Sequence, residues 1–200
     1  MSTVTVGLSI SADGYVAGPN DGPANPLGDG GHRLFAWMNA GPARNRINRW
    51  LCPPTASLPV VEGWTTGCGA LLAGRRTFDI ANGWRDGHPV DAPIFVVTHR
   101  APTEGEWHPK LRFVTGGVEE AVRLASEVAG DGVVSASAAG LARSLLGAGL
   151  LDELELNVVP CLLGGGVSLF GGIGPAQYDL EQLSVIPSDG VTHVRYRVSR

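Results

Sequence analysis

The start of the chain alternates between apolar residues and small or polar ones. Val4, Val6, Leu8 and Ile10 are each separated by one such residue. This period of two predicts a β-strand with one strongly apolar face. Short apolar runs, several of them rich in β-branched residues, predict further strands. These runs cover residues 70–73, 94–98, 111–114, 133–134 and 154–158.

Helical patterns lie between several of these strands. Residues 119–129 form the clearest one, with acidic residues in the first turn and a glycine directly after the end. Residues 141–146 predict a second helix, which also stops at a glycine. Two more helices are expected over residues 33–38 and 43–51, before a pair of prolines breaks the pattern.

The order of these elements predicts the fold class. Because parallel neighbouring strands need a crossover that a helix usually supplies, we expect an α/β fold with a mostly parallel central sheet. Residues 191–198 place apolar side chains on one face and a histidine and two arginines on the other, which predicts an antiparallel closing strand with one wet face. Residues 19–31 are mostly glycine, proline, asparagine and aspartate and predict a long mobile loop. One domain over residues 1–200 is expected.

The composition argues against several classes of protein. The 200 residues are 44% hydrophobic and carry a net charge of −4, with scattered Lys and Arg, so neither nucleic acid nor an anionic membrane is expected as a partner. The three cysteines are far apart and the five histidines lack a metal-ligand spacing, so neither disulfides nor a metal site are expected. No apolar run is long enough to span a bilayer, which predicts a cytoplasmic protein.

The sharpest chemical signal is a pair of cationic turns. Gly74-Arg75-Arg76-Thr77 follows one predicted strand, and Thr98-His99-Arg100 ends the next. Open α/β sheets bind ligands beyond the carboxyl ends of their strands, and guanidinium groups match phosphate oxygens. The alternative is that these arginines are ordinary surface cations.

These two turns resemble the cofactor-binding half of the dihydrofolate reductase superfamily. Residues 11–15, Ser-Ala-Asp-Gly-Tyr, resemble the Ser-x-Asp-Gly turn that ends the first strand in riboflavin-pathway reductases. Residues 149–154 and 162–170 are similar to that subfamily's later signature. Together the matches run in the expected order from Val4 to Val198. The resemblance implies a dihydrofolate reductase-like three-layer α/β/α fold and the reductase half of the riboflavin-pathway enzyme.

The resemblance also implies NADPH as cofactor. The arginines and histidine of the two turns would surround its 2′-phosphate. A glycine turn at residues 164–166 would let the backbone approach the cofactor closely. The same glycines could instead form only a tight turn. The residues expected to bind NADPH are Gly74, Arg75, Arg76, Thr77, Thr98, His99, Arg100, Ser137, Ala138, Ala139, Gly164, Gly165 and Gly166. Relatives of this subfamily also suggest a homodimer.

One departure from the family concerns the turn before the helix at 141–146. The family usually has a Gly-Gly pair there, whereas this chain has Ser137-Ala138. Ser137 could cap the helix and donate its hydroxyl to phosphate. Neither residue tolerates positive φ as glycine does, which predicts a weaker cofactor site.

Few catalytic side chains are expected, because the nicotinamide itself carries the hydride. Asp13 is the candidate proton donor, with Tyr15 second, and the alternative for Asp13 is a turn residue. Trp37 and Trp84 are candidate walls for the substrate, and both could equally belong to the core. Residues 33–51 lack the acid that grips the pterin in dihydrofolate reductases, so we expect another small heterocycle with a reducible C=N or C=O bond.

Two other functions remain open. A non-catalytic nucleotide-binding or regulatory module of the same fold would also fit, with Ser137-Ala138 marking a degraded cofactor site. A hydrolase that uses Ser137 is disfavoured, because residues 136–140 lack the first glycine of the Gly-x-Ser-x-Gly nucleophile elbow.

Overall fold

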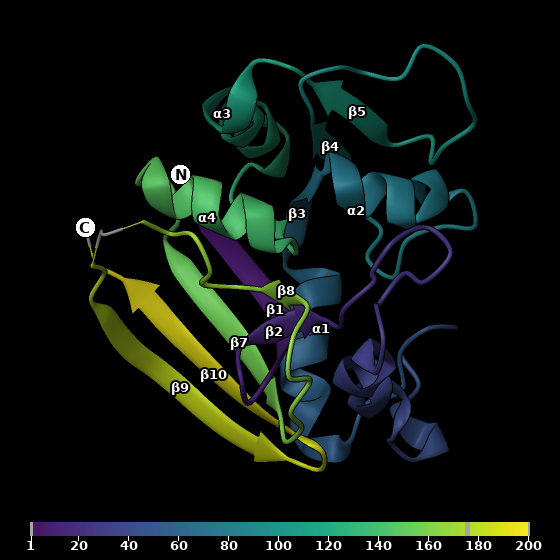
Figure 1. Ribbon diagram of the computed structural model, residues 1–200, viewed down its shortest axis with the longest axis vertical. Coiled ribbons are helices and arrows are strands. Elements are labelled where there is room, and N and C mark those ends of the chain that lie inside the picture. The colour runs from purple at the N-terminus through teal and green to yellow at the C-terminus, as the bar shows by residue number, and fades with distance from the viewer. Residues whose placement is uncertain (1, 175–176, 200) are drawn as a thin grey trace.

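The computed structural model describes residues 2–174 and 177–199, and its centre is one eight-stranded sheet (Figure 1). The strand order is β5-β4-β3-β6-β1-β7-β10-β9. The strands are β1 (Val4–Ser11), β3 (Cys68–Gly74), β4 (Ile94–Val97), β5 (Leu111–Val114), β6 (Val133–Ala136), β7 (Glu153–Val159), β9 (Leu180–Ser188) and β10 (Val191–Val198). The first six strands in this order, from β5 through β4, β3, β6 and β1 to β7, are parallel to one another. Strand β10 is antiparallel to both of its neighbours, β7 and β9. The predicted fold class is therefore confirmed.

Four α-helices cover the two faces of the sheet. They are α1 (Leu58–Thr66), α2 (Arg75–Ile80), α3 (Gly117–Ala129) and α4 (Ala139–Gly147). Helices α3 and α4 pack together on one face, which Figure 1 shows toward the viewer, and α1 lies on the other. Right-handed crossovers require this arrangement, because the chain moves in one direction from β1 to β5 and in the opposite direction from β5 to β7.

The alternating pattern of the strands divides the core between the two faces. In β3, Ala70 and Leu72 pack under α3 and α4, whereas Leu71 and Ala73 pack with Phe78 of α2 on the opposite face. The sheet is thus buried on both sides at its centre. This burial explains why the central strands are rich in apolar residues.

The helix expected over residues 43–51 is wrong. Only the 3-10 turn Ala43–Asn45 forms there, and α1 begins later in the chain. Asn45 Nδ2 donates to the Pro53 carbonyl over 2.9 Å, and Asn48 Oδ1 accepts from the backbone N–H groups of Trp50 and Leu51 over 2.9 and 3.0 Å. These side chains give the backbone an alternative to helical hydrogen bonds. The helix expected over residues 33–38 is present as the 3-10 helix Gly31–Asn39.

Asn48 should contribute measurably to stability. Besides its two backbone acceptor contacts, its Nδ2 donates to the Pro89 carbonyl over 3.0 Å. We expect Asn48→Ala to lower the free energy of unfolding by about 1–2 kcal/mol in urea titrations. Asn39→Ala is the matched control, since exposed Asn39 donates one bond, to the Trp50 carbonyl. Equal effects of the two substitutions would contradict this role for Asn48.

The expected loop at residues 19–31 is folded back on itself. Gly18 N donates to the Leu27 carbonyl over 2.9 Å, and Asp29 N donates to the Pro19 carbonyl over 2.7 Å. The Asp29 carboxylate also accepts hydrogen bonds from two asparagine side chains of the loop. The loop therefore has internal structure that its composition does not reveal.

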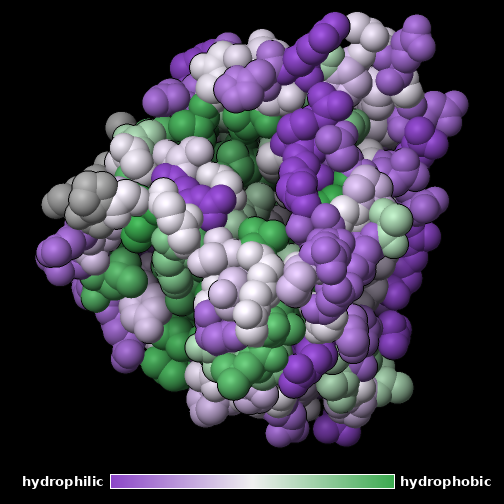
Figure 2. All heavy atoms as spheres, viewed as in Figure 1, coloured by the Kyte–Doolittle hydropathy of each residue, from purple (hydrophilic) through white to green (hydrophobic). Residues whose placement is uncertain are grey.

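Strand β9 forms one edge of the sheet and presents apolar side chains to solvent. Leu180 is 43% exposed and Val185 is 46% exposed. Figure 2 shows hydrophobic residues gathered on the side where β9 and β10 lie, whereas hydrophilic residues dominate the opposite side. Among the described helices, none combines the length and apolar character needed to cross a membrane.

Candidate functional site

The predicted site residues gather at the carboxyl ends of the parallel strands. Gly74 at the end of β3 pairs with Val97 of β4, and Leu72 of β3 pairs with Ala136 at the end of β6. Ala136 also pairs with Val6 of β1. The turns that follow these strands therefore meet at one edge of the sheet, which is where open α/β sheets bind ligands (Figure 1).

Arg75 connects the two cationic turns. Its Nε donates to Asp79 over 2.9 Å, and its Nη1 donates to the carbonyl of Arg100 over 2.8 Å. Buried Thr98 fixes the second turn, because its hydroxyl donates to the same carbonyl over 3.0 Å. His99 and Arg100 are exposed. The Arg75 side chain thus joins the two turns, and the second turn exposes His99 and Arg100.

Arg76 points instead to the loop at residues 19–31. Its Nε donates to Asp21 Oδ2 over 2.9 Å, and its Nη2 donates to the Asp21 carbonyl over 2.7 Å. The hydrogen bond and charge of Asp21 raise the pKa of the Arg76 guanidinium above its usual value. The loop is therefore attached to the first turn of α2. A phosphate that binds Arg76 must share this side chain with Asp21.

The Ser137-Ala138 turn lacks the side-chain cap expected for it. Ala138 is the N-cap of α4, with φ −135° and ψ 134°, and no side chain caps the helix, so the predicted capping by Ser137 is wrong. In the described part of the chain, positive φ outside glycine occurs only at Asn20, Asn82 and Trp84. The backbone here therefore does not need glycine, and these two residues impose no strain on the turn.

The three glycines at 164–166 have different surroundings. Gly164 has φ +72° and faces open space, since a Cβ there would meet nothing within 4 Å. Gly166 has φ +120°, and a Cβ there would lie 2.1 Å from the carbonyl oxygen of Ala17. Gly166 is thus needed for packing against β2 (Tyr15–Ala17), which pairs with β8 (Val167–Ser168). Gly164 therefore has open space beside its backbone, as the cofactor prediction requires, and a Cβ at Gly165 would meet only Pro19 Cγ, at 3.6 Å.

Asp13 connects the turn that follows β1, at residues 11–15, to this glycine segment. Its carboxylate accepts hydrogen bonds from the backbone N–H groups of Leu163, over 3.1 Å, and Gly164, over 2.7 Å. Two hydrogen bonds do most to lower the pKa of Asp13: the one with Ser11 has the larger effect, and the one from Gly164 has the smaller. An ionised carboxylate that only accepts hydrogen bonds suits positioning better than proton donation. Tyr15 lies two residues further on, at the start of β2, and is half-buried.

The structure does not bring Trp37 and Trp84 together. Trp37 is 2% exposed, donates its indole N–H to Ser9 Oγ over 3.2 Å, and packs on the α1 face. Trp84 belongs to a separate cluster and contacts the ring of Phe78. Its φ of +51° is unusual for a large side chain. The two side chains therefore cannot be opposite walls of one pocket.

The lack of Asp and Glu in residues 33–51 does not by itself argue against a pterin substrate. The helix that leads into β3 is α1, and it contains the exposed residue Glu62. Residues 33–51 form two 3-10 helices and no α-helix.

The sequence does not predict a buried polar network between β7, β10 and the residue before α1. His193 Nε2 lies 2.8 Å from Ser57 Oγ, and His193 Nδ1 lies 2.5 Å from Asn157 Oδ1. His193 was expected on a wet face of β10 but is 3% exposed, because Trp37 and Ser57, the residue before α1, pack against it. Burial lowers the pKa of His193 to about 4. Polar residues at inward-facing strand positions, such as Asn157, were the available signal.

Comparison with known proteins agrees with this architecture. A family model described as the RibD C-terminal domain matches residues 2–194. A putative riboflavin biosynthesis protein from Shewanella sp. PV-4 is 22% identical, with a TM-score of 0.68 and full coverage of both chains. RibD from Acinetobacter baumannii is 18% identical with a TM-score of 0.63, and the match covers all of this chain but 59% of that one.

A more distant neighbour carries the cofactor that the motifs suggest. Dihydrofolate reductase from Enterococcus faecalis, in a complex with NADP(H), is 14% identical with a TM-score of 0.59, covering 99% of this chain and 97% of that one. A search of the curated proteins found no match. The solved structures establish the dihydrofolate reductase-like fold, and the family model establishes the subfamily. The chain therefore belongs to the RibD C-terminal domain family, as the turn and glycine motifs indicated.

Proposed function

We propose that this protein is an NADPH-dependent reductase that transfers a hydride to a C=N or C=O bond of a small heterocycle. The observation that carries the proposal is that the Arg75 side chain joins the turn after β3 to the turn after β4, where His99 and Arg100 are exposed. Guanidinium groups at such a position favour a dinucleotide with an extra phosphate. The riboflavin biosynthesis protein and RibD, to which this chain is similar, support a heterocyclic substrate.

The other residues at this edge fit the rest of the cofactor. The N-terminus of α4, which follows Ser137 and Ala138, has no side-chain cap, so its first backbone N–H groups suit the pyrophosphate. Thr77 lies in the first turn of α2 and would offer its hydroxyl. Gly164 leaves room for close approach of the backbone. When bound, the nicotinamide would supply the hydride. The protein's own contribution is to bind, orient and shield the reacting groups.

Asp13 is assigned a positioning role in this proposal. Its ionised carboxylate holds the backbone of Leu163 and Gly164, and so fixes the turn that would border the cofactor. The proton for the reduced centre would then come from the Tyr15 hydroxyl or from water rather than from Asp13. Asp13→Asn should therefore weaken cofactor binding and leave the pH dependence of turnover nearly unchanged.

The phosphate assignment can be tested with a double substitution. Arg75→Ala with Arg76→Ala should weaken NADPH binding about tenfold or more, because charge-assisted hydrogen bonds to the phosphate are lost. NADH binding should change little, and fluorescence titration measures both. Arg123→Ala, at an exposed arginine of α3 that pairs with Glu127, is the control. Equal losses for NADH and NADPH would contradict the assignment.

A further inference from the structure

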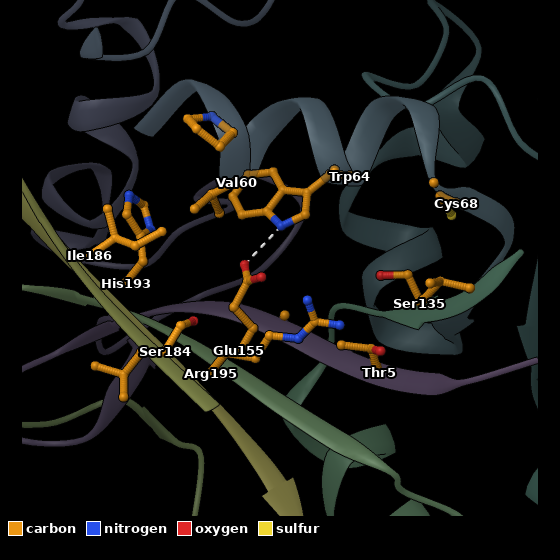
Figure 3. Close-up of a pocket in the computed structure, with 16 residues that line it drawn as sticks. Thr5, Val60, Trp64, Cys68, Ser135, Glu155, Ser184, Ile186, His193 and Arg195 are labelled. Carbon is orange, nitrogen blue, oxygen red and sulfur yellow. Dashed lines mark hydrogen bonds between the residues drawn. The ribbon is translucent and has the colours of Figure 1, made fainter. Parts of the chain in front are cut away.

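A groove separate from the cofactor edge lies between α1 and the sheet (Figure 3). Its cavity volume is about 380 Å³. Thr5, Val133 and Cys68 line it, and each lies at or near the start of its strand. The turns expected to bind the cofactor follow the other ends of the same strands. The groove is therefore a different place in the molecule from the proposed NADPH site.

The floor of the groove contains an unsatisfied polar atom. Thr5 Oγ1 is buried without a hydrogen-bond partner, one of two such side-chain atoms in the described residues, and Thr5 as a whole is 9% exposed. Buried hydroxyls are normally paired, and an unpaired one costs stability. Because Thr5 lines the cavity, a ligand in the groove could supply the missing partner.

A largely buried carboxylate faces the same cavity. Glu155 Oε1 accepts a hydrogen bond from Trp64 Nε1 over 2.7 Å, and Figure 3 shows the two side chains meeting across the groove. Arg195 lies opposite Glu155 in the β7–β10 ladder, yet its Nε donates to Glu153 over 2.6 Å. Within residues 2–174 and 177–199, none of the ion pairs includes Glu155. Burial raises the pKa of Glu155, although hydrogen bonds with Trp64 and Asn157 and the charge of Arg195 act in the opposite direction.

The remaining walls combine apolar side chains with polar ones, the latter being Ser135, Ser184, His193 and Arg195. Val60 and the Trp64 ring come from α1, and Ile186 comes from β9. Gly7 leaves space in the floor, since a Cβ there would meet only Glu155 Oε1, at 3.8 Å. A helix above a sheet leaves a slot that suits a planar ring, and the volume is sufficient for a small one.

We propose that this groove is a second ligand site, for a small planar cation with an amidinium-type pair of N–H donors. The paired donors match the two oxygens of the Glu155 carboxylate, as a guanidinium does. The Thr5 hydroxyl accepts from, or donates to, the polar edge of the ligand, and the ring lies along Trp64 and Val60. The site does not depend on the proposed hydride transfer.

Benzamidine is a suitable probe, and benzamide is its neutral counterpart. Titration of the full chain by calorimetry and by NMR should give saturable benzamidine binding, with shifts in the Trp64 indole N–H signal and much weaker binding of benzamide. Glu155→Gln should weaken benzamidine binding about tenfold or more, and Thr5→Val about threefold. Glu119→Gln, at an exposed acid in the first turn of α3, should have no effect.

A second variant keeps the test valid if Glu155→Gln is poorly folded. Gly7→Val fills the floor of the groove without removing a charge, and it should abolish benzamidine binding while NADPH titration is unchanged. The inference is overturned if the folded wild-type protein shows no saturable benzamidine binding, or if binding survives both Glu155→Gln and Gly7→Val. If the wild-type protein binds benzamidine but not NADPH, the proposed reductase function is contradicted and the second ligand site is not.

Discussion

Alanine at Gly166 is expected to lower the free energy of unfolding by about 3 kcal/mol. Gly166 has φ +120°, a region that only glycine adopts readily, and its Cβ would lie 2.1 Å from the Ala17 carbonyl oxygen. Ala17 pairs with Val167, so relief of this clash must separate β2 from β8. The same movement would displace the turn that Asp13 holds. Reduced affinity for NADPH should therefore accompany the loss of stability.

The neighbouring glycine provides the control. Gly164 also has positive φ, +72°, but a Cβ there would enter open space. Gly164→Ala should cost only about 1 kcal/mol, from backbone strain. Urea unfolding of the two variants separates strain from steric clash. Similar losses for both substitutions would show that Gly166 does not make the close contact described.

The second large effect concerns pH and the buried residue His193. Burial lowers the pKa of His193 in the folded protein to about 4, from 6.5 in its absence. Between these two values the unfolded chain binds the proton more readily, so stability falls as the pH falls from 6.5 to 4. The contribution is fully present above pH 6.5 and totals about 3 kcal/mol. The groups that contact His193, Ser57, Asn157 and Trp37, are themselves neutral.

A variant isolates this contribution from those of other titrating groups. His193→Gln cannot gain a proton, so its stability should decline less than that of the wild-type protein between pH 7 and about pH 4.5. Glu155, whose pKa is raised, changes stability in the opposite direction with pH and is common to both proteins. His99→Gln, at an exposed histidine, should follow the wild-type curve. Parallel curves for wild-type and His193→Gln proteins would refute the burial argument.

The strands were predictable because their patterns are local. The alternation in Val4–Ser11 and the apolar runs at β3, β4 and β5 reflect burial on both faces of the sheet. Strand β9 escaped detection, since the register shifts between Arg195 and Tyr196 and leaves Leu183 out of the pairing. A bulge of this kind breaks the period of two on which strand detection depends.

Tertiary contacts explain most of the remaining errors. Nothing near Arg76 in the sequence indicates that it binds Asp21, because 55 positions separate the two. The burial of His193 depends on a helix, α1, that the sequence analysis did not identify. The cationic turns at 74–77 and 98–100 were predictable, since each directly follows a recognisable strand, and parallel pairing then brings them together. Side-chain partners from distant segments had no comparable local signal.

The central claim is that the sheet edge above β3, β4 and β6 binds a dinucleotide with a 2′-phosphate. Its most direct test is a paired fluorescence titration of the unaltered protein with NADPH and with NADH. We expect saturable binding of both, with NADPH preferred by about tenfold or more, because one additional phosphate gains charge-assisted contacts. Equal affinities for NADPH and NADH, or saturable binding of neither, would contradict it.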